Sequence, residues 1–208
     1  MSIAELPELE ILRRDLEKDV VGKKVKTVEA PSAATIKRAG SKKALVSRLE
    51  GAKIDGVSRR GTWLVLKLDT GEALMIALGD RAYLQRNQAK DEVAKGTAVV
   101  LTFTQHGQLR LVDPAKSSEL FVVPAEEVDD IVGHLGLDLV DEPVSWTKFG
   151  EMVLRKGGKL KSILMDPGVL VGIGPMYSDE ILFEAGLRYD RTADRLSTQE
   201  IRRLYRAS

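Results

Sequence analysis

Length, composition and charge describe an ordinary globular chain. The 208 residues carry 32 Lys and Arg against 31 Asp and Glu, a formal net charge of +1, which argues against indiscriminate coating of nucleic acid. Cysteine is absent, which excludes disulfides and thiol catalysis, and no apolar run approaches the roughly 20 residues that span a bilayer. We therefore expect a cytoplasmic protein with no metal, no cofactor and no membrane contact.

The first half of the chain predicts two helices followed by antiparallel strands. Apolar residues at helical spacing predict helices over residues 7–21 and 42–49, with Pro7 in the first turn of the first helix. Asp69-Thr-Gly and His106-Gly have the composition of hairpin turns, and the polar residues 85–96 predict a loop. Alternating patterns predict six strands, over residues 53–57, 62–68, 73–78, 98–103, 108–112 and 119–123.

The pattern changes to helical after Pro124 and stays helical to the end. The last predicted helix begins at Ser197, which with Glu200 has the spacing of a capping box. We therefore predict an α+β fold with two domains, an antiparallel β domain over residues 1–124 and a helical domain over 125–208. The other helices are predicted over residues 125–133, 146–155, 160–165 and 175–185.

A glycine-hinged turn that opens a helix is the most informative local motif. Gly172 and Gly174 precede Pro175, which a first helical turn tolerates, and the free amides of such a helix start can hold a phosphate. The same pattern fits a helix that only packs. A dinucleotide site is set aside because the third glycine of that fingerprint is Tyr177 here. Basic residues precede the turn at Arg155, Lys156, Lys159 and Lys161, a run that is usually a solvated face.

Several segments, in order along nearly the whole chain, resemble the formamidopyrimidine-DNA glycosylase (Fpg/Nei) family of base excision repair. They are Glu5-Leu-Pro-Glu-Leu-Glu10, Arg59-Arg60-Gly-Thr-Trp-Leu, Leu135-Gly136-Leu-Asp138, and Leu160-Lys-Ser-Ile-Leu-Met-Asp166 followed by Val171-Gly-Ile-Gly-Pro. The last pair is similar to the helix-two-turns-helix element that grips the DNA backbone. The resemblance implies an N-terminal β-sandwich flanked by helices, a helical domain, and DNA in the cleft between them.

The resemblance also implies a mechanism, in which an N-terminal proline amine attacks C1′ of the damaged nucleotide and the next glutamate moves protons. The matching positions are Ala4 and Glu5, and Ala4 follows three residues, so its nitrogen is an amide unless processing removes them. Without an adjacent amine, Glu5 can act only as a carboxylate at a helix N-terminus. The catalytic assignment is therefore Glu5 with the position of Ala4, conditional on a nearby amine.

Other positions depart from the family in the same direction. Asp80 stands where the family has a methionine wedge that fills the space left by a flipped base, and Thr62 replaces a lysine. Residues 113–118, Asp-Pro-Ala-Lys-Ser-Ser, lack the arginine and the aromatic that stabilise an opened base pair. Pro175 replaces a phosphate-binding asparagine, and the family's four-cysteine zinc finger has no counterpart before Ser208.

Three hypotheses follow for the function. The first is a catalytically degenerate member that binds double-stranded DNA through Lys161, Gly172 and Gly174, with Arg60 and Lys159 as further contacts. The second is an active glycosylase or abasic-site lyase that uses an N-terminal amine with Glu5. The third is a protein-interaction module on the same fold, with Asp80 and residues 85–96 as its altered surface.

Overall fold

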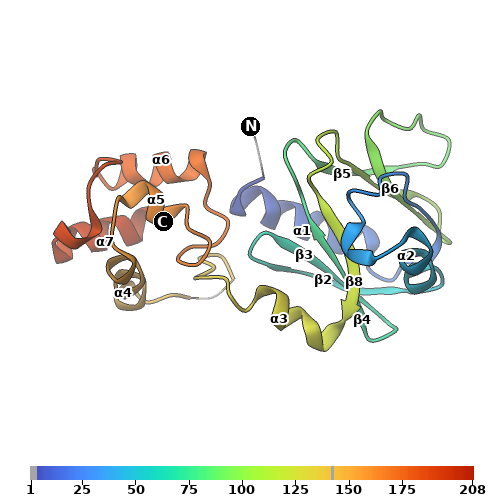
Figure 1. The fold of residues 1–208 in the computed structure, drawn as a ribbon, viewed down its shortest axis with the longest axis horizontal. Helices are drawn as coiled ribbons and strands as arrows, with labels where there is room; N and C mark the ends of the chain where they lie inside the picture. Colours follow the sequence, from blue (N-terminus) through green and yellow to red (C-terminus); the bar gives the residue numbers. More distant parts are fainter. Residues whose placement is uncertain (1–3, 142) are drawn as a thin grey trace. The chain divides into compact units, whose positions relative to one another are not determined.

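The computed structural model describes residues 4–141 and 143–208, which form two compact units. The first unit extends to Ile131 and the second runs from Val132 to Ser208. Figure 1 labels helices and strands of the first unit and helices of the second. The domain boundary expected from composition, between residues 124 and 125, stays a prediction.

The first unit contains two four-stranded antiparallel sheets with the helices α1 and α2 (Figure 1). One sheet has the order β1-β6-β7-β5 and the other β2-β3-β4-β8. A short 3-10 turn, η2, and helix α3 follow the last strand. The elements are α1 (Leu6–Val20), β1 (Val25–Glu29), η1 (Lys37–Ala39), α2 (Lys42–Leu49), β2 (Ile54–Arg60), β3 (Trp63–Leu68), β4 (Glu72–Ala77), β5 (Tyr83–Asn87), β6 (Thr97–Phe103), β7 (Gln108–Val112), β8 (Glu119–Pro124), η2 (Ala125–Glu127) and α3 (Val128–Val132).

One hydrophobic core joins both sheets and both helices of this unit. Leu101 comes from the first sheet and Leu66 from the second, and both belong to the same buried cluster. Leu16 of α1 and Leu49 of α2 join that cluster, because each helix turns its apolar stripe toward the strands. The predicted α+β class, with an antiparallel β-sandwich flanked by helices, is confirmed.

All six predicted strands are present, but two further strands were missed. β5 occupies Tyr83–Asn87, so the loop predicted over residues 85–96 is wrong for its first three residues. β5 is an edge strand that pairs only with β7, and it is held by backbone hydrogen bonds more than by burial. β1 was missed because a register shift between Val25 and Thr27 interrupts the alternation of buried side chains.

The two predicted hairpin turns lie where the sequence put them. His106 and Gly107 both have positive φ, 68° and 83°, and they end the loop of residues 104–107 between β6 and β7. Gly71 has a φ of 81° between β3 and β4. Both turns therefore use residues that tolerate the left-handed region, which explains why composition alone located them.

The second unit is helical and has its own core. Phe149, Leu164, Leu182 and Leu204 are buried together, one from each of its four helices. The capping box predicted between Ser197 and Glu200 is present at the start of the last helix. The elements are α4 (Trp146–Lys156), α5 (Leu160–Leu164), α6 (Pro175–Glu184), η3 (Ala193–Arg195) and α7 (Thr198–Ala207).

No helix within residues 4–141 and 143–208 combines the length and apolar character needed to cross a membrane.

Candidate functional site

Glu5 is fixed at the beginning of α1. It is the N-cap residue, only 8% exposed, and its backbone amide donates to Oε2 of Glu8 at 3.2 Å. The two residues form a capping box, which stabilises the first turn of the helix. Ala4 precedes it and is half-buried, whereas residues 1–3 lie outside the described part of the chain. The helix-capping role expected of Glu5 is therefore present, and its catalytic role stays a prediction.

A network centred on Glu10 ties α1 to the hairpin between β2 and β3. Its carboxylate accepts from Nε of Arg14 at 2.9 Å, from Nε and Nη2 of Arg13 at 3.1 Å, and from Nε of Arg59 at 3.3 Å. Burial alone would raise the pKa of Glu10, but the hydrogen bonds from Arg13 and Arg14, the charge of Arg13 and the bond from Arg59 together lower it. The carboxylate is therefore held in its charged form.

Arg59 connects this network to the turn that follows Arg60, the last residue of β2. The Arg59 side chain is fully buried, and its Nη1 donates to the carbonyl of Gly61 at 3.0 Å. Arg60, the next residue, is exposed and pairs with Trp63 in the hairpin register. The predicted DNA contact Arg60 is thus presented on a turn whose backbone is fixed from inside.

Two serine side chains join the loop of residues 113–118 to the residues 77–80 by hydrogen bonds. Oγ of Ser118 accepts from the amide of Gly79 at 3.0 Å, and Oγ of Ser117 accepts from the amide of Asp80 at 2.9 Å. A Cβ on Gly79 would lie 2.2 Å from Oγ of Ser117 and 2.6 Å from the nitrogen of Ser118, so only glycine fits there. The two serines that depart from the family pattern therefore hold the residues 77–80 against the residues 113–118.

The carboxylate of Asp113 holds the loop of residues 113–118 through hydrogen bonds. It is 1% exposed, and its Oδ2 accepts from the amide of Ser118 at 3.0 Å and from Oγ1 of Thr35 at 2.9 Å. Its Oδ1 accepts from the amide of Ser117 at 3.1 Å. Oδ1 of Asp80, in the other loop, is buried with no hydrogen-bond partner among the described residues. The Asp80 carboxylate is thus partly turned into the protein.

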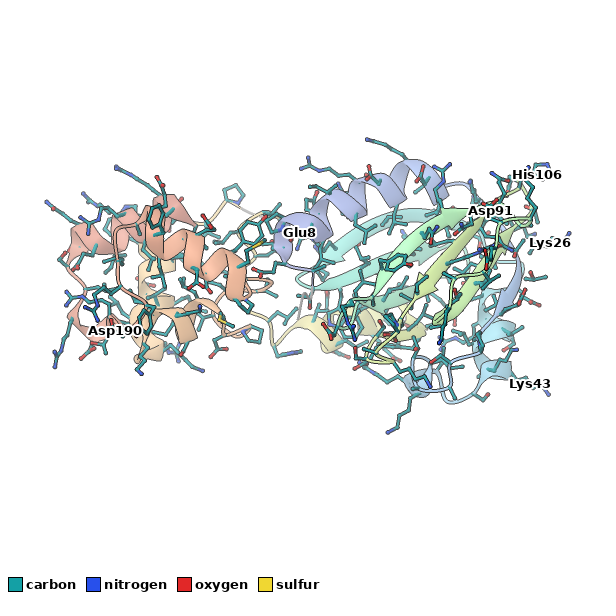
Figure 2. All side chains as sticks on the ribbon, turned by 90° about the horizontal axis from the view of Figure 1, so that it is seen from above. Glu8, Lys26, Lys43, Asp91, His106 and Asp190 are labelled. Atoms are coloured by element: carbon teal, nitrogen blue, oxygen red, sulfur yellow. The ribbon has the colours of Figure 1, made fainter. Side chains whose placement is uncertain are left out.

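His106 lies away from the start of α1. Figure 2 shows Glu8 at one end of the first unit and His106 with Asp91 at the other. The residues 4–141 and 143–208 contain no group of three or more histidine, aspartate or glutamate side chains that could hold a metal ion.

In the second unit, the predicted glycine turn joins α5 to α6. Gly172 has a φ of 75°, in the left-handed region, whereas Gly174 is extended and serves as the N-cap of α6. Pro175 occupies the first turn of α6, and Gly186, with a φ of 63°, follows the end of this helix. Asp166 holds the start of the turn, because its Oδ1 accepts from the amide of Gly168 at 2.8 Å.

A short stretch of parallel pairing holds this turn in place. The amide of Gly136 donates to the carbonyl of Pro167 at 2.8 Å, and Leu137 and Leu170 form an isolated parallel bridge. A Cβ on Gly136 would lie 2.4 Å from the carbonyl oxygen of Val169, closer than real Cβ atoms approach backbone. Gly136 therefore permits the close approach that positions the turn of Gly172.

The basic run before the turn is partly ion-paired. Nζ of Lys156 lies 2.6 Å from Asp166, and this hydrogen bond, with that from Gly168, lowers the pKa of the Asp166 carboxyl. Nζ of Lys161 lies 2.6 Å from Oδ1 of Asp179 on α6. Lys159 is the N-cap of α5, and its side chain is exposed. The predicted residues of this unit thus gather around α5 and the start of α6.

Sequence reasoning missed Asp179 as a member of this group. Lys161 and Asp179 are separated by 18 residues and lie on different helices, so no helical spacing connects them. Ala4, Glu5 and Arg60 belong to the first unit, whereas Lys159, Lys161, Gly172 and Gly174 belong to the second.

Comparisons with known proteins match both units. The family model described as the formamidopyrimidine-DNA glycosylase N-terminal domain matches residues 3–120, and that of the H2TH domain of the same enzymes matches residues 135–208. The formamidopyrimidine-DNA glycosylase of Enterococcus faecalis is 32% identical over 213 residues, which cover 98% of this chain and 72% of that protein. The enzyme of Listeria monocytogenes serotype 4b is 31% identical, covering 98% and 75%.

Solved structures give the same result. The Lactococcus lactis Fpg in complex with DNA containing an abasic site has a TM-score of 0.90 and 27% identity, covering 98% of this chain and 74% of that one. A complex of the Lactococcus lactis protein with DNA containing N7-benzyl-Fapy-dG has a TM-score of 0.90 and the same identity, covering 98% and 75%.

Proposed function

Since this chain belongs to the formamidopyrimidine-DNA glycosylase family, we propose that it is a DNA-binding member of that family whose catalytic centre is degenerate. Its ligand is double-stranded DNA, including damaged or irregular duplexes. The observation that carries the proposal is the contrast between its two units. The second has a glycine turn before a helix N-terminus, which suits phosphate, whereas in the first Ala4 and Asp80 stand where the family has its nucleophile and its wedge, and only Glu5 is kept.

DNA binding is supported by the second unit. Gly172 and the start of α6 provide a glycine turn and a helix N-terminus, a combination suited to phosphate. Lys161, beside that start, supplies a cation, and exposed Lys159 and Arg60 are further candidates. The similar Lactococcus lactis proteins are in complex with DNA in their solved structures, which supports the same partner here.

Loss of the glycosylase chemistry is supported by Ala4 and Glu5. Ala4 follows Ile3 in the sequence, so its nitrogen is an amide, and an amide is not the nucleophile that imine formation requires. Glu5 is engaged as the N-cap of α1. A carboxylate in that position stabilises a helix whether or not it moves protons, so its retention does not require catalysis.

Loss of base opening is supported by the two loops that Ser117 and Ser118 join. Enzymes that flip a base must replace its stacking, commonly with an inserted apolar side chain. Here Asp80 stands at that position, and Ser117 and Ser118 hydrogen-bond to the neighbouring backbone. A carboxylate and two hydroxyls that bond to the backbone cannot replace the stacking of a base. We therefore infer that the protein binds the duplex without flipping a base out of it.

Duplex binding is expected to be micromolar and only moderately salt-dependent, because few cations contact phosphate. Fluorescence anisotropy with a labelled duplex should show a dissociation constant on the order of micromolar near physiological salt. Lys161→Ala should weaken binding to all sequences by a similar factor, since phosphate contacts carry no sequence information. Lys43→Ala, which removes the same charge from the exposed surface of α2, is the matched control. Absence of duplex binding by the wild type even at about 50 mM salt would refute the proposal.

Borohydride trapping separates the degenerate protein from the active enzyme. With duplexes that contain an abasic site or an oxidised base, we expect no covalent adduct, because the nitrogen of Ala4, the residue before Glu5, is bonded to Ile3 as an amide. The Enterococcus faecalis relative, assayed in parallel, controls for the substrate. An adduct that disappears when the N-terminal amine is blocked would instead establish the lyase hypothesis.

A further inference from the structure

We propose that Asp179 is a built-in competitor for DNA phosphate, whose carboxylate holds Lys161 and thereby lowers the affinity of the second unit for DNA. This inference rests on the proposed function and describes how its phosphate-binding residue is regulated. It assigns a role to a carboxylate that sequence reasoning left unused.

The ion pair between the Lys161 ammonium and the Asp179 carboxylate is the basis for this competition. Nζ of Lys161 lies 2.6 Å from Oδ1 of Asp179, within the range of a charge-assisted hydrogen bond. The pair joins α5 to α6, so the cation is held across the start of the helix that follows the glycine turn. A phosphate that binds Lys161 must therefore displace a carboxylate oxygen or share the ammonium with it.

The pair is accessible, which makes the competition reversible. The Lys161 side chain is 31% exposed and that of Asp179 is 59% exposed. Exposed ion pairs contribute little to folding, because water and salt screen them and two long side chains lose freedom. A phosphate can therefore displace Asp179 without disturbing the helices. The backbone of Lys161 is fixed separately, since its amide donates to the carbonyl of Tyr189 at 3.4 Å.

Asp179 opposes binding in two ways. It occupies a donor that phosphate would use, and after displacement its negative charge remains close to the bound phosphate. In the isosteric Asp179→Asn variant the second effect vanishes with the charge, and the first weakens, because a neutral amide oxygen accepts a weaker hydrogen bond from the ammonium than a carboxylate does. We expect D179N to bind duplex about threefold to tenfold more tightly than the wild type at about 50 mM salt, and by a smaller factor at about 200 mM.

The salt dependence provides a second readout. In the wild type, contact with phosphate exchanges one anionic partner of Lys161 for another, which reduces the net release of counterions. In D179N the lysine has no anionic partner to exchange at this position. The slope of log affinity against log salt should therefore steepen by up to about one unit.

A neighbouring carboxylate provides the matched control. Glu180 is exposed on the same helix, one residue further on. E180Q removes the same charge from nearly the same place, so it measures the general effect of net charge on DNA affinity. We expect D179N to exceed E180Q by at least about threefold at low salt, because only D179N also releases Lys161.

The experiment is duplex anisotropy with the wild type, D179N, E180Q, K161A and the double variant K161A/D179N. The gain from D179N should shrink to the E180Q level in the K161A background, because the competition acts through that lysine. Thermal unfolding checks that D179N remains folded, and an exposed pair should change the midpoint little. If D179N equals E180Q, or if its excess gain survives K161A, the inference is overturned while DNA binding stands. If neither the wild type nor D179N binds duplex, the proposed function itself falls, and the inference falls with it.

Discussion

Replacing Gly136 by alanine is expected to destabilise the second unit by about 3 kcal/mol or more and to weaken DNA binding with it. The added Cβ would lie 2.4 Å from the oxygen and 2.5 Å from the carbon of the Val169 carbonyl, and 2.7 Å from the carbon of Gly168. All three are backbone atoms, so no side chain can rotate away. The clash can therefore be relieved only if the backbone at Gly136 moves away from the backbone at Gly168 and Val169.

Separation would break the bonds that hold the glycine turn. The amides of Gly136 and Leu137 donate to Pro167 and Val169 at 2.8 and 2.9 Å, and the amide of Val171 donates back to Leu137 at 3.0 Å. The residue after Val171 is Gly172. A shift here therefore reaches the proposed phosphate site directly, although Gly136 is not part of it.

Urea unfolding and duplex anisotropy of the same variant measure both effects. Gly56→Ala is the control, because a Cβ there meets nothing within 4 Å and its φ lies outside the left-handed region. We expect that control to remain within about 1 kcal/mol of the wild type. The chain forms two units, so each transition must be followed separately. A G136A protein as stable as G56A would show that the close approach at Gly136 is not required.

The fold was predictable where local physics decides it. α2 occupies the predicted residues 42–49 and the capping box of Ser197 lies where predicted, because helix caps are set by neighbouring residues. β5 was missed because an edge strand is defined by its partner, β7, and not by its own polar sequence.

The candidate site was predictable only in part, for the same reason. The motifs around Gly172 and Lys161 predict a phosphate site by their residue types. The contacts around these residues join positions far apart in the chain, as Gly136 with Val169 and Lys161 with Asp179 do. No periodicity links such pairs. They follow from the packing of helices and loops, which the sequence pattern specifies only as a whole.

The second large effect is expected at Glu10, where substitution by glutamine should destabilise the first unit by about 2 to 3 kcal/mol at neutral pH. The Glu10 side chain is only 12% exposed and that of Arg59 is fully buried. Glutamine keeps one acceptor oxygen but removes the charge that balances Arg13, Arg14 and Arg59. Hydrogen bonds between charged groups are about twice as strong as neutral ones, so the loss is larger than for a surface pair.

The dependence on pH follows from the direction of the pKa shift. The folded protein lowers the pKa of Glu10 below its ordinary value of 4.5, against the opposing effect of burial, through the hydrogen bonds from Arg13 and Arg14. The unfolded state therefore takes up the proton first as the pH falls. The stabilisation is fully present above about pH 4.5 and is lost as the pH falls through the lowered folded pKa. The difference between the wild type and E10Q should shrink over that acidic window.

Glu17→Gln makes the same exchange on the same helix and separates burial from charge. Glu17 also pairs with Arg13, at 2.7 Å, but its side chain is 53% exposed, so its loss should cost no more than about 0.5 kcal/mol. Urea midpoints of the wild type, E10Q and E17Q, measured from neutral to acidic pH, test the prediction. Equal effects of the two variants, or an E10Q effect that grows on acidification, would contradict it. A large effect confined to E10Q would mean that the carboxylate of Glu10 stabilises the buried guanidinium of Arg59, and with it the hairpin that contains Arg60.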